Sequence, residues 1–379
     1  MIIFLLILIF LRPFISSLAY PYANAVYSLI FLGLLSLWIN EKKVCLQELK
    51  TVKYPLILFI CTLLISSIFS TNRFNSFSAI FQYAIGILIF LICSSSTIRN
   101  RILIIRVIFF TGVIISVLAI HQYFFGFTEL ANLAKQEGIN SSFLKDYINS
   151  RRTFFPFVTP NILAGYLAMI MPLAFIYKRR IWLLLPITAA LFSTKSIGGF
   201  ISITVVTIIY LLLSKKTNNK KFIFALSVLI IAITVVIFLR STTQRLHQQP
   251  LFSTAMRLDY LGETIKVIAH APFKGIGPGN FTLPVSRYAH NSYLQLWAEC
   301  GIIGLIALLW FIAAVLIQSV KVMGKSAHKR EISCLFCASI VFLLHNLIDF
   351  SFYLPEVSFI WCAILGLLYS FSRDSLPES

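Results

Sequence analysis

Polar residues with the chemistry for proton transfer are concentrated in one segment of the chain, about residues 240–290. Arg257, Arg287 and His290 lie there, and His290 and Asn291 directly precede an apolar segment. A histidine at such a boundary titrates near neutral pH and can act as a general base. The alternative is that His290 and Asn291 only cap the following helix. Two arginines in the same segment favour the general-base interpretation.

The residues around Arg257 predict a short amphipathic helix over 255–271, which Pro272 would end. Apolar residues recur there at spacings of three or four: Leu258, Leu261, Ile265 and Ile268. We expect this stripe to be buried and Arg257 to border it. A half-buried arginine requires an anionic or hydrogen-bonding partner, so Arg257 is a candidate anion ligand.

Other polar patterns favour structural interpretations. Asp259 and Glu263 could hold a metal ion, but a solvated ion pair with Lys266 is the simpler interpretation. The glycine-rich segment 274–281 weakly resembles a phosphate-binding loop, yet it follows a helix, so we predict a tight turn. His345 and Asp349 are spaced for one helix face, where we expect a structural hydrogen bond.

Two further cations lie close to expected helix ends. Arg152 precedes the apolar segment that begins near residue 158, and Lys195 lies in a turn between two short apolar segments. The Lys195 side chain could extend along the apolar surface to reach water. It could also line a polar outer cavity.

The whole composition determines which elements position these residues. Of the 379 residues, 59% are hydrophobic and 12% are charged, about half the charged fraction of a soluble domain. We predict an all-α, polytopic integral membrane protein with about twelve transmembrane helices and a long extracytoplasmic loop that contains short helices. The expected spans are about 2–19, 23–40, 54–70, 77–95, 102–124, 158–177, 181–194, 197–213, 222–239, 291–319, 332–349 and 356–372.

Charge predicts the orientation of these spans. Every second loop is short and basic, which places both termini and these loops in the cytoplasm. The loops 125–157 and 240–290 then face outward, although they also carry arginine and lysine. Long loops are translocated regardless of charge, so these cations either have no special role or bind an anionic ligand.

The cysteines and the chain's organisation give two more expectations. The seven cysteines lie mostly in apolar segments, so we expect no disulfide framework, and the pair Cys334 and Cys337 packs in a helix. We divide the chain into an N-terminal transmembrane part, 1–150, and a part that carries the polar motifs, 151–379.

The motifs together resemble the O-antigen ligase and polymerase superfamily over roughly residues 150–370. The matching segments are RTFFPFVTPNILAGYL, STKSIGG, AMRLDYLGETIKVIAHAPFKGIGPGNF, AHNSYLQLWAECGIIGL and LLHNLIDFSFYLPEVSFIWCAILGLL. The glycine-rich block followed by the His-Asn motif is specific in combination. Residues 1–150 match only as hydrophobic spans.

The resemblance implies transfer of a glycan from an undecaprenyl-pyrophosphate-linked donor to an acceptor hydroxyl, with inversion and without metal or cofactor. It implies that His290 is the catalytic base and that Arg257 engages the pyrophosphate. Arg152, Lys195, Arg287 and Asn291 are the further candidate ligands of pyrophosphate or substrate. Many relatives have an arginine where this chain has Ile197, and Lys195 is the nearby cation, without the bidentate geometry of arginine.

The implied setting is the bacterial inner membrane, with the site on its extracytoplasmic side. The most favoured role is an O-antigen ligase with lipid A-core as acceptor; polysaccharide polymerase and protein O-oligosaccharyltransferase are the alternatives within the family. A transporter or flippase of twelve helices is the alternative from another class, disfavoured because no internal repeat is evident and few cations lie deep in the spans. No nucleic-acid partner is expected, because the positive charge belongs to membrane topology.

Overall fold

A computed structural model describes residues 2–41, 49–139, 142–213, 227, 230, 231, 233–238, 252–284 and 286–376. Within these ranges, every regular element is a helix, apart from an isolated bridge between Leu283 and Ser286. The all-α prediction is confirmed. Several predictions concern residues outside these ranges: Cys45 and most of the basic loop 41–53, the basic loop 214–221, half of the span 222–239, and the beginning of the outer loop up to residue 251.

Four helical segments are long and apolar enough to cross a membrane: Arg73–Ser94, Ile98–Gln136, Ser292–Met323 and Pro355–Arg373. Five shorter apolar segments accompany them within the described residues: Ile2–Phe14, Pro21–Leu34, Lys53–Ile68, Pro160–Ile176 and Ile197–Leu211. The chain is therefore a helical membrane protein, and the number of about twelve spans stays a prediction.

The helices form two compact units, which are described separately. Unit 1 contains residues 1–105, 253–336 and 346–379, and unit 2 contains residues 106–252 and 337–345. Two of the boundaries fall inside helices, α5 (Ile98–His121) and α14 (Lys329–His345).

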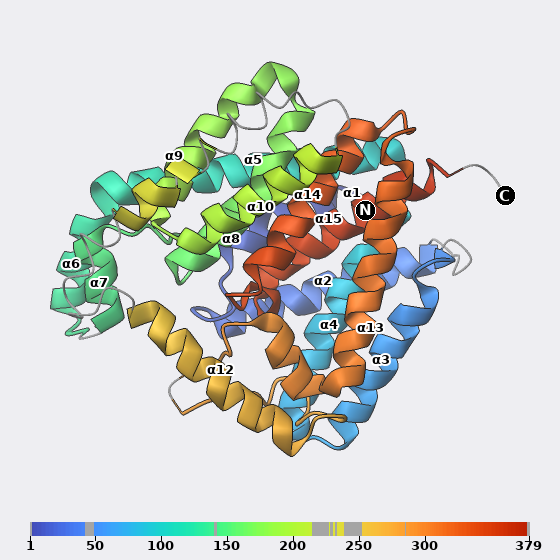
Figure 1. Cartoon of the computed structure of the whole chain (residues 1–379), viewed down its shortest axis with the longest axis horizontal. Helices are drawn as coiled ribbons and strands as arrows, with labels where there is room; N and C mark the ends of the chain where they lie inside the picture. The colour runs from blue at the N-terminus through green and yellow to red at the C-terminus, as the bar shows by residue number, and fades with distance from the viewer. Residues whose placement is uncertain are drawn as a thin grey trace. The chain divides into compact units, whose positions relative to one another are not determined.

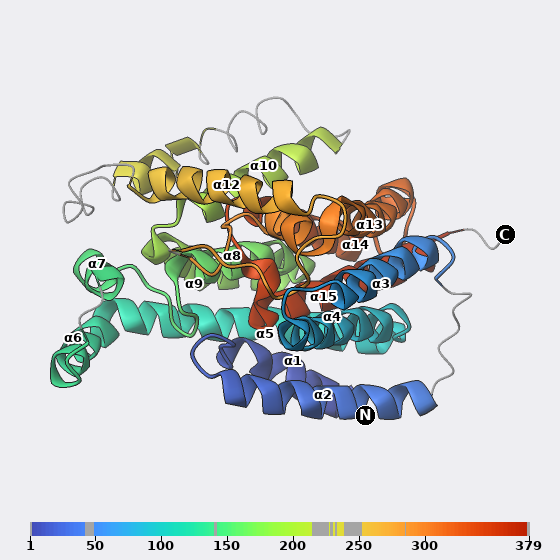
Figure 2. The ribbon, with the colours of Figure 1, turned by 90° about the horizontal axis from the view of Figure 1, so that it is seen from below.

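Unit 1 is built around the C-terminal helix α15 (Pro355–Arg373), which packs along α4 (Arg73–Ser94) and α13 (Ser292–Met323). Within an apolar stretch of 18 residues in α15, 94% of the residues are buried, whereas the corresponding share in α4 is 39%. Helix α15 is therefore the central helix of the unit. Figure 1 shows α3 (Lys53–Ile68) alongside α13, and Figure 2 shows α1 (Ile2–Leu11) beside α2 (Pro21–Glu41). Helix α12 (Phe252–His270) also belongs to this unit, apart from its first residue.

A buried ion pair fixes the start of α15 within unit 1. Arg12 belongs to the turn η1 (Arg12–Phe14) and contacts Glu356 at 3.3 Å, and both side chains are 1% exposed. Arg12 also donates a hydrogen bond of 2.7 Å to the Asn24 side chain. Because a buried charge is stable only when paired and hydrogen-bonded, this cation has a structural role and does not serve an external anion.

Unit 2 is centred on α8 (Pro160–Ile170), which packs against α9 (Leu184–Thr194) and α10 (Ile197–Leu213). It also contains the turns η3 (Gln122–Gly126), η4 (Met171–Ile176) and η5 (Lys178–Leu183), and the short helices α6 (Phe127–Gln136) and α7 (Ser142–Ser150). Thr159 caps α8 by accepting a hydrogen bond from the Ile162 backbone at 3.3 Å, and Pro160 starts the helix. His345, the last residue of α14, contacts the Asn161 carbonyl oxygen at 3.1 Å.

The described cysteines are free, and Cys334 and Cys337 are buried in α14. This confirms the packing role predicted for that pair. No metal-binding role follows from it, because no third suitable side chain gathers with them in the described ranges.

Candidate functional site

Asn291, and not His290, caps the helix α13. The Asn291 side chain accepts hydrogen bonds from the Tyr293 and Leu294 backbones, both at 3.1 Å. His290 precedes the cap with a positive φ of 52°. The two residues therefore have different roles, and the capping interpretation of His290 is not supported.

The His290 imidazole lies among aromatic rings. It stacks on Tyr260 of α12, with ring centroids 5.2 Å apart and planes 15° apart, and meets Phe350 edge-on at 4.9 Å. Phe350 in turn stacks on Tyr288 at 4.1 Å. The Nδ1 atom of His290 is buried without a hydrogen-bond partner within the described residues. The ring is thus oriented by packing.

The surroundings of His290 favour the neutral imidazole. Burial lowers the pKa of His290, the Asp349 carboxylate raises it in part, and the Arg257 guanidinium lowers it further. Burial has the strongest influence, because a charged ring loses hydration there. A neutral imidazole near pH 7 has the protonation state that a general base requires.

Asp349 lies near His290 in the structure, although the sequence had placed it on a helix face shared with His345. Because α14 ends at His345, the predicted shared helix face of His345 and Asp349 does not form. The turn after α14 is instead attached to the start of α13: Ser292 donates hydrogen bonds to the Asn346 side chain at 2.7 Å and to the Asp349 carbonyl at 3.1 Å. This attachment brings the Asp349 charge close enough to affect His290.

Arg257 lies on α12, whose predicted helix is confirmed, but most of the predicted buried stripe is wrong. Leu258, Leu261 and Ile265 are 64%, 37% and 53% exposed. Ile268 is buried as predicted, on the same face as Tyr260 and Thr264. Apolar side chains of a membrane protein can face lipid, so their spacing does not identify the face that packs against protein.

Arg257 itself keeps the expected position at the edge of the buried face. It is partly buried and lies one helical turn before Tyr260. No salt bridge joins Arg257 to a carboxylate within the described residues. The acidic Glu263 pairs with Lys266 at 2.6 Å, as predicted, and not with Arg257. Arg257 thus retains the capacity to bind an anion.

The glycine-rich segment is a structural turn that docks against a break in α13. Gly301 interrupts α13 with a positive φ of 72°, and this break leaves backbone groups without helical partners. The Ile276 and Gly277 backbones donate to the Ala298 and Glu299 carbonyl oxygens, both at 2.9 Å. A β-carbon on Gly275 would overlap the Glu299 backbone, so this close contact requires glycine.

The same segment orients Glu299, a buried acid. Its carboxylate accepts hydrogen bonds from the Gly279 backbone and from the Gln295 side chain, each at 3.1 Å. Arg287 is exposed and precedes Tyr288, and it is near enough to Glu299 for their charges to interact. The turn prediction for 274–281 is therefore confirmed, with the positioning of Glu299 as its consequence.

Arg152 and Lys195 lie together in unit 2. Arg152, which is buried, donates hydrogen bonds to the Thr194 carbonyl at 3.1 Å and to the Asn161 side chain at 3.3 Å. Lys195 ends α9 and donates to the Ser150 carbonyl at 2.7 Å. Burial and the nearby Arg152 charge lower the pKa of Lys195. Two cations that lie this close to each other are suited to an anionic ligand.

Backbone strain coincides with these candidate residues. Within the described residues, the non-glycine positions with positive φ are Arg151, Lys195 and His290, at 47°, 51° and 52°. Such conformations cost roughly 1–3 kcal/mol and persist where the surrounding structure imposes them, often at functional sites. Arg151 adjoins the candidate ligand Arg152, and Lys195 and His290 are themselves candidate site residues.

The structure thus brings His290, Asn291, Arg257 and Arg287 into unit 1, and Arg152 and Lys195 into unit 2. Ile197 begins α10, two residues after Lys195, so it supplies no cation to that turn. Sequence reasoning missed Tyr260 and Phe350 as ring contacts of His290. The position of Tyr260 one helical turn after Arg257 was an available signal, whereas nothing in the sequence pointed to Phe350.

Comparison with known families gives a match to part of the chain. Residues 182–309 match the family model described as O-antigen ligase, a range that contains Lys195, Arg257, Arg287, His290 and Asn291 but not Arg152. None of the curated proteins compared with the chain matches it. The helical membrane architecture agrees with this match, which covers about a third of the chain and supports the O-antigen ligase superfamily.

Proposed function

We propose that the protein transfers a glycan from an undecaprenyl-pyrophosphate-linked donor to an acceptor hydroxyl at the outer face of the bacterial inner membrane. The proposed role is that of an O-antigen ligase with lipid A-core as acceptor. The observation that carries the proposal is the aromatic-packed imidazole of His290, whose pKa is lowered by burial and by the Arg257 charge, inside the matched family region.

In the proposed reaction, His290 is the general base. The acceptor oxygen forms a bond to the anomeric carbon while the bond from that carbon to the pyrophosphate oxygen breaks. The acceptor proton passes to the imidazole, and the electron pair of the broken bond leaves with the lipid pyrophosphate. Direct displacement inverts the configuration at the anomeric carbon. The lowered pKa of His290 keeps the imidazole able to accept a proton near pH 7.

In this proposal, cations stabilise the pyrophosphate leaving group. Arg257 has no carboxylate partner within the described ranges, so its guanidinium can make a bidentate contact with a phosphate group. Arg287 is proposed as a further ligand and Asn291 as a substrate contact, and Arg152 and Lys195 of unit 2 are separately proposed as anion ligands. Enzymes often gain most of their rate enhancement by stabilising charge that develops in the transition state, and fixed cations can do this without a metal or cofactor.

Charge at the two ends of α13 supports the proposed sidedness. His290 and Asn291 precede the helix, and Lys321, Lys325 and Lys329 lie at or after its other end. The positive-inside rule predicts that the basic end is cytoplasmic. The end that carries His290 then faces the compartment where the glycan donor would arrive already activated on its lipid.

An assay in lipid nanodiscs tests the function directly. The protein receives lipid-linked glycan together with lipid A-core, with no added acceptor, or with an acceptor protein, and His290→Ala serves as the inactive control. Glycosylated lipid A-core supports the ligase proposal. Lengthened lipid-linked glycan would identify a polymerase, and a glycosylated protein an oligosaccharyltransferase. Movement of the donor across a bilayer without any product would replace the proposal with a flippase.

A further inference from the structure

Unit 1 contains a cavity of about 630 Å³ between α2, α4, α13 and α15. This volume lies within the roughly 300–1,000 Å³ that small-molecule sites occupy. The cavity is lined mostly by apolar side chains, with Phe90 and Leu308 among them. Its other walls are polar, which is unusual between helices of a membrane protein unless a polar ligand or water is present.

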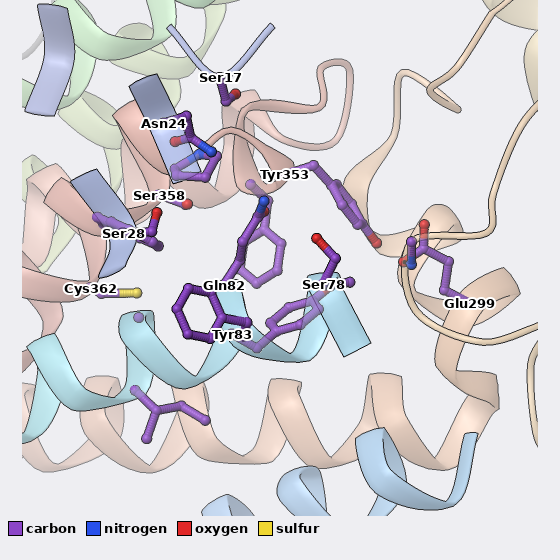
Figure 3. Close-up of a pocket in the computed structure, with 18 of the residues that line it drawn as sticks. Ser17, Asn24, Ser28, Ser78, Gln82, Tyr83, Glu299, Tyr353, Ser358 and Cys362 are labelled. Atoms are coloured by element: carbon purple, nitrogen blue, oxygen red, sulfur yellow. Dashed lines mark hydrogen bonds between the residues drawn. The ribbon is translucent and has the colours of Figure 1, made fainter. Parts of the chain in front are cut away.

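Polar groups from separate helices converge on this cavity. Figure 3 shows Gln82 of α4 near its centre, with Asn24 and Ser28 of α2 and Ser358 of α15 around it. The Ser28 hydroxyl is buried without a hydrogen-bond partner in the described part of the chain. Amides and hydroxyls of this kind donate and accept hydrogen bonds, so they match the hydroxyl groups of a sugar.

The cavity is close to neutral overall. The charged residues that line it are Arg287 and Glu299, one of each sign. A phosphate or pyrophosphate group would require an excess of cations in the cavity wall. The cations Arg152 and Lys195 belong to unit 2 and do not line this cavity. The charge balance therefore favours a neutral, hydroxyl-rich ligand over an anionic one.

Aromatic contacts connect the cavity to the candidate base. Tyr288 lines the cavity and stacks on Phe350, whose edge-on partner is His290. One aromatic ring thus separates the cavity wall from the imidazole.

We propose that this cavity binds a neutral sugar unit of one of the two glycan substrates, with Gln82 as a specificity-determining residue. The proposal rests on the proposed function, because that function supplies the glycan. The helices α2, α4 and α15 lie outside the matched residues 182–309. The part of the chain beyond the family match would therefore select the sugar.

Two adjacent residues of α4 provide a matched binding test. Ser78 lines the cavity and is exposed, and its neighbour Phe77 is 64% exposed and is not part of the lining. Ser78→Cys and Phe77→Cys are made in the His290→Ala protein, so binding is measured without turnover. Labelling of each cysteine by a maleimide is followed by peptide mass spectrometry.

Four probes identify the ligand: the extracted lipid-linked glycan, the same glycan released by mild acid, core oligosaccharide released from lipid A, and sugar-free undecaprenyl pyrophosphate. We expect a sugar-bearing probe to slow labelling at position 78 at least threefold and to leave position 77 unchanged. Protection by released donor glycan identifies the donor as source, and protection by core oligosaccharide identifies the acceptor. Protection by sugar-free lipid alone, or by no probe, overturns the proposal.

Kinetics separate this proposal from the proposed function. Gln82→Leu should raise KM for one glycan substrate roughly three- to tenfold, the effect of one lost hydrogen bond, and leave kcat nearly unchanged. The control is Gln136→Leu, the same change at an exposed position of unit 2. An unchanged KM for both substrates in an active enzyme overturns the sugar site alone. If the unmodified protein is inactive toward every acceptor, the proposed function is wrong. The labelling result then still shows whether the cavity binds a sugar.

Discussion

The His290 imidazole lies flat on the phenol ring of Tyr260, with 5.2 Å between ring centroids and 15° between planes. Tyr260 follows Arg257 by one turn of α12, and His290 precedes the cap of α13. This single contact therefore joins the helix that carries the candidate anion ligand to the helix start that carries the candidate base. It gives Tyr260 a positioning role that can be tested separately from chemistry.

Replacing Tyr260 should affect turnover through the orientation of His290. Tyr260→Phe keeps the stacked ring, so we expect near-normal kcat. Tyr260→Ala removes a contact worth about 0.5–1.5 kcal/mol, and we expect kcat to fall roughly tenfold with little change in KM for the donor. Steady-state rates of purified protein check this. A lower kcat in Tyr260→Phe would show that the hydroxyl, and not the ring, is what matters.

His290→Ala should lower turnover by ~10²–10⁴, the usual effect of removing a positioned general base. Membrane abundance should stay normal, because the cap of α13 is made by Asn291. His270→Ala, the same change at an exposed histidine that ends α12, is the control and should keep its activity. Specific activity per folded molecule is the measurement. Near-normal activity of His290→Ala would remove this residue from the mechanism.

The pH dependence should reveal which charges act on His290. Burial lowers the pKa of His290, so activity should fall only as pH drops below the ordinary histidine value of 6.5, where the base becomes protonated. The Asp349 carboxylate opposes this shift, so Asp349→Asn should move the acidic limb of the kcat/KM profile to still lower pH. Arg257→Ala removes a positive charge and should move the limb to higher pH. Shifts in the same direction for both variants would contradict this electrostatic account.

Arg257→Ala should lower kcat by ~10²–10³, similar to the loss of one fixed donor to a developing negative charge. Arg257→Lys should restore activity only in part, because lysine keeps the charge but cannot make a bidentate contact. Both variants should insert normally, since Arg257 has no ion-pair partner within the described residues. Transfer rates normalised to protein content test the pair. Full activity of Arg257→Lys would show that charge alone suffices.

The sidedness of the site can be tested with single cysteines in intact cells. Phe273 is 72% exposed between α12 and α13, and Lys325 is exposed after α13. We expect a membrane-impermeant maleimide to label Phe273→Cys in spheroplasts, and to label Lys325→Cys only after the membrane is opened. The reverse pattern would place His290 in the cytoplasm and defeat the proposed reaction.

Local sequence patterns determined much of this protein. Continuous apolar segments predicted a helical membrane protein, because a chain in lipid must satisfy its backbone hydrogen bonds internally. The helix around Arg257, the glycine-rich turn and the lysine turn at Lys195 followed from local rules, and all three are confirmed. Asn291 as a helix cap was also predictable, because its side chain interacts with backbone only two and three residues away.

Tertiary structure alone decided which partners these residues meet. The buried face of α12 carries Tyr260 and not Leu258, because an apolar side chain in a membrane protein can face either lipid or protein. Asp349 acts on His290 because the turn after α14 is attached to the start of α13. Arg12 and Glu356 form a buried pair although 344 positions separate them. Such contacts depend on how whole helices pack, and the periodicity of a single segment contains no information about that packing.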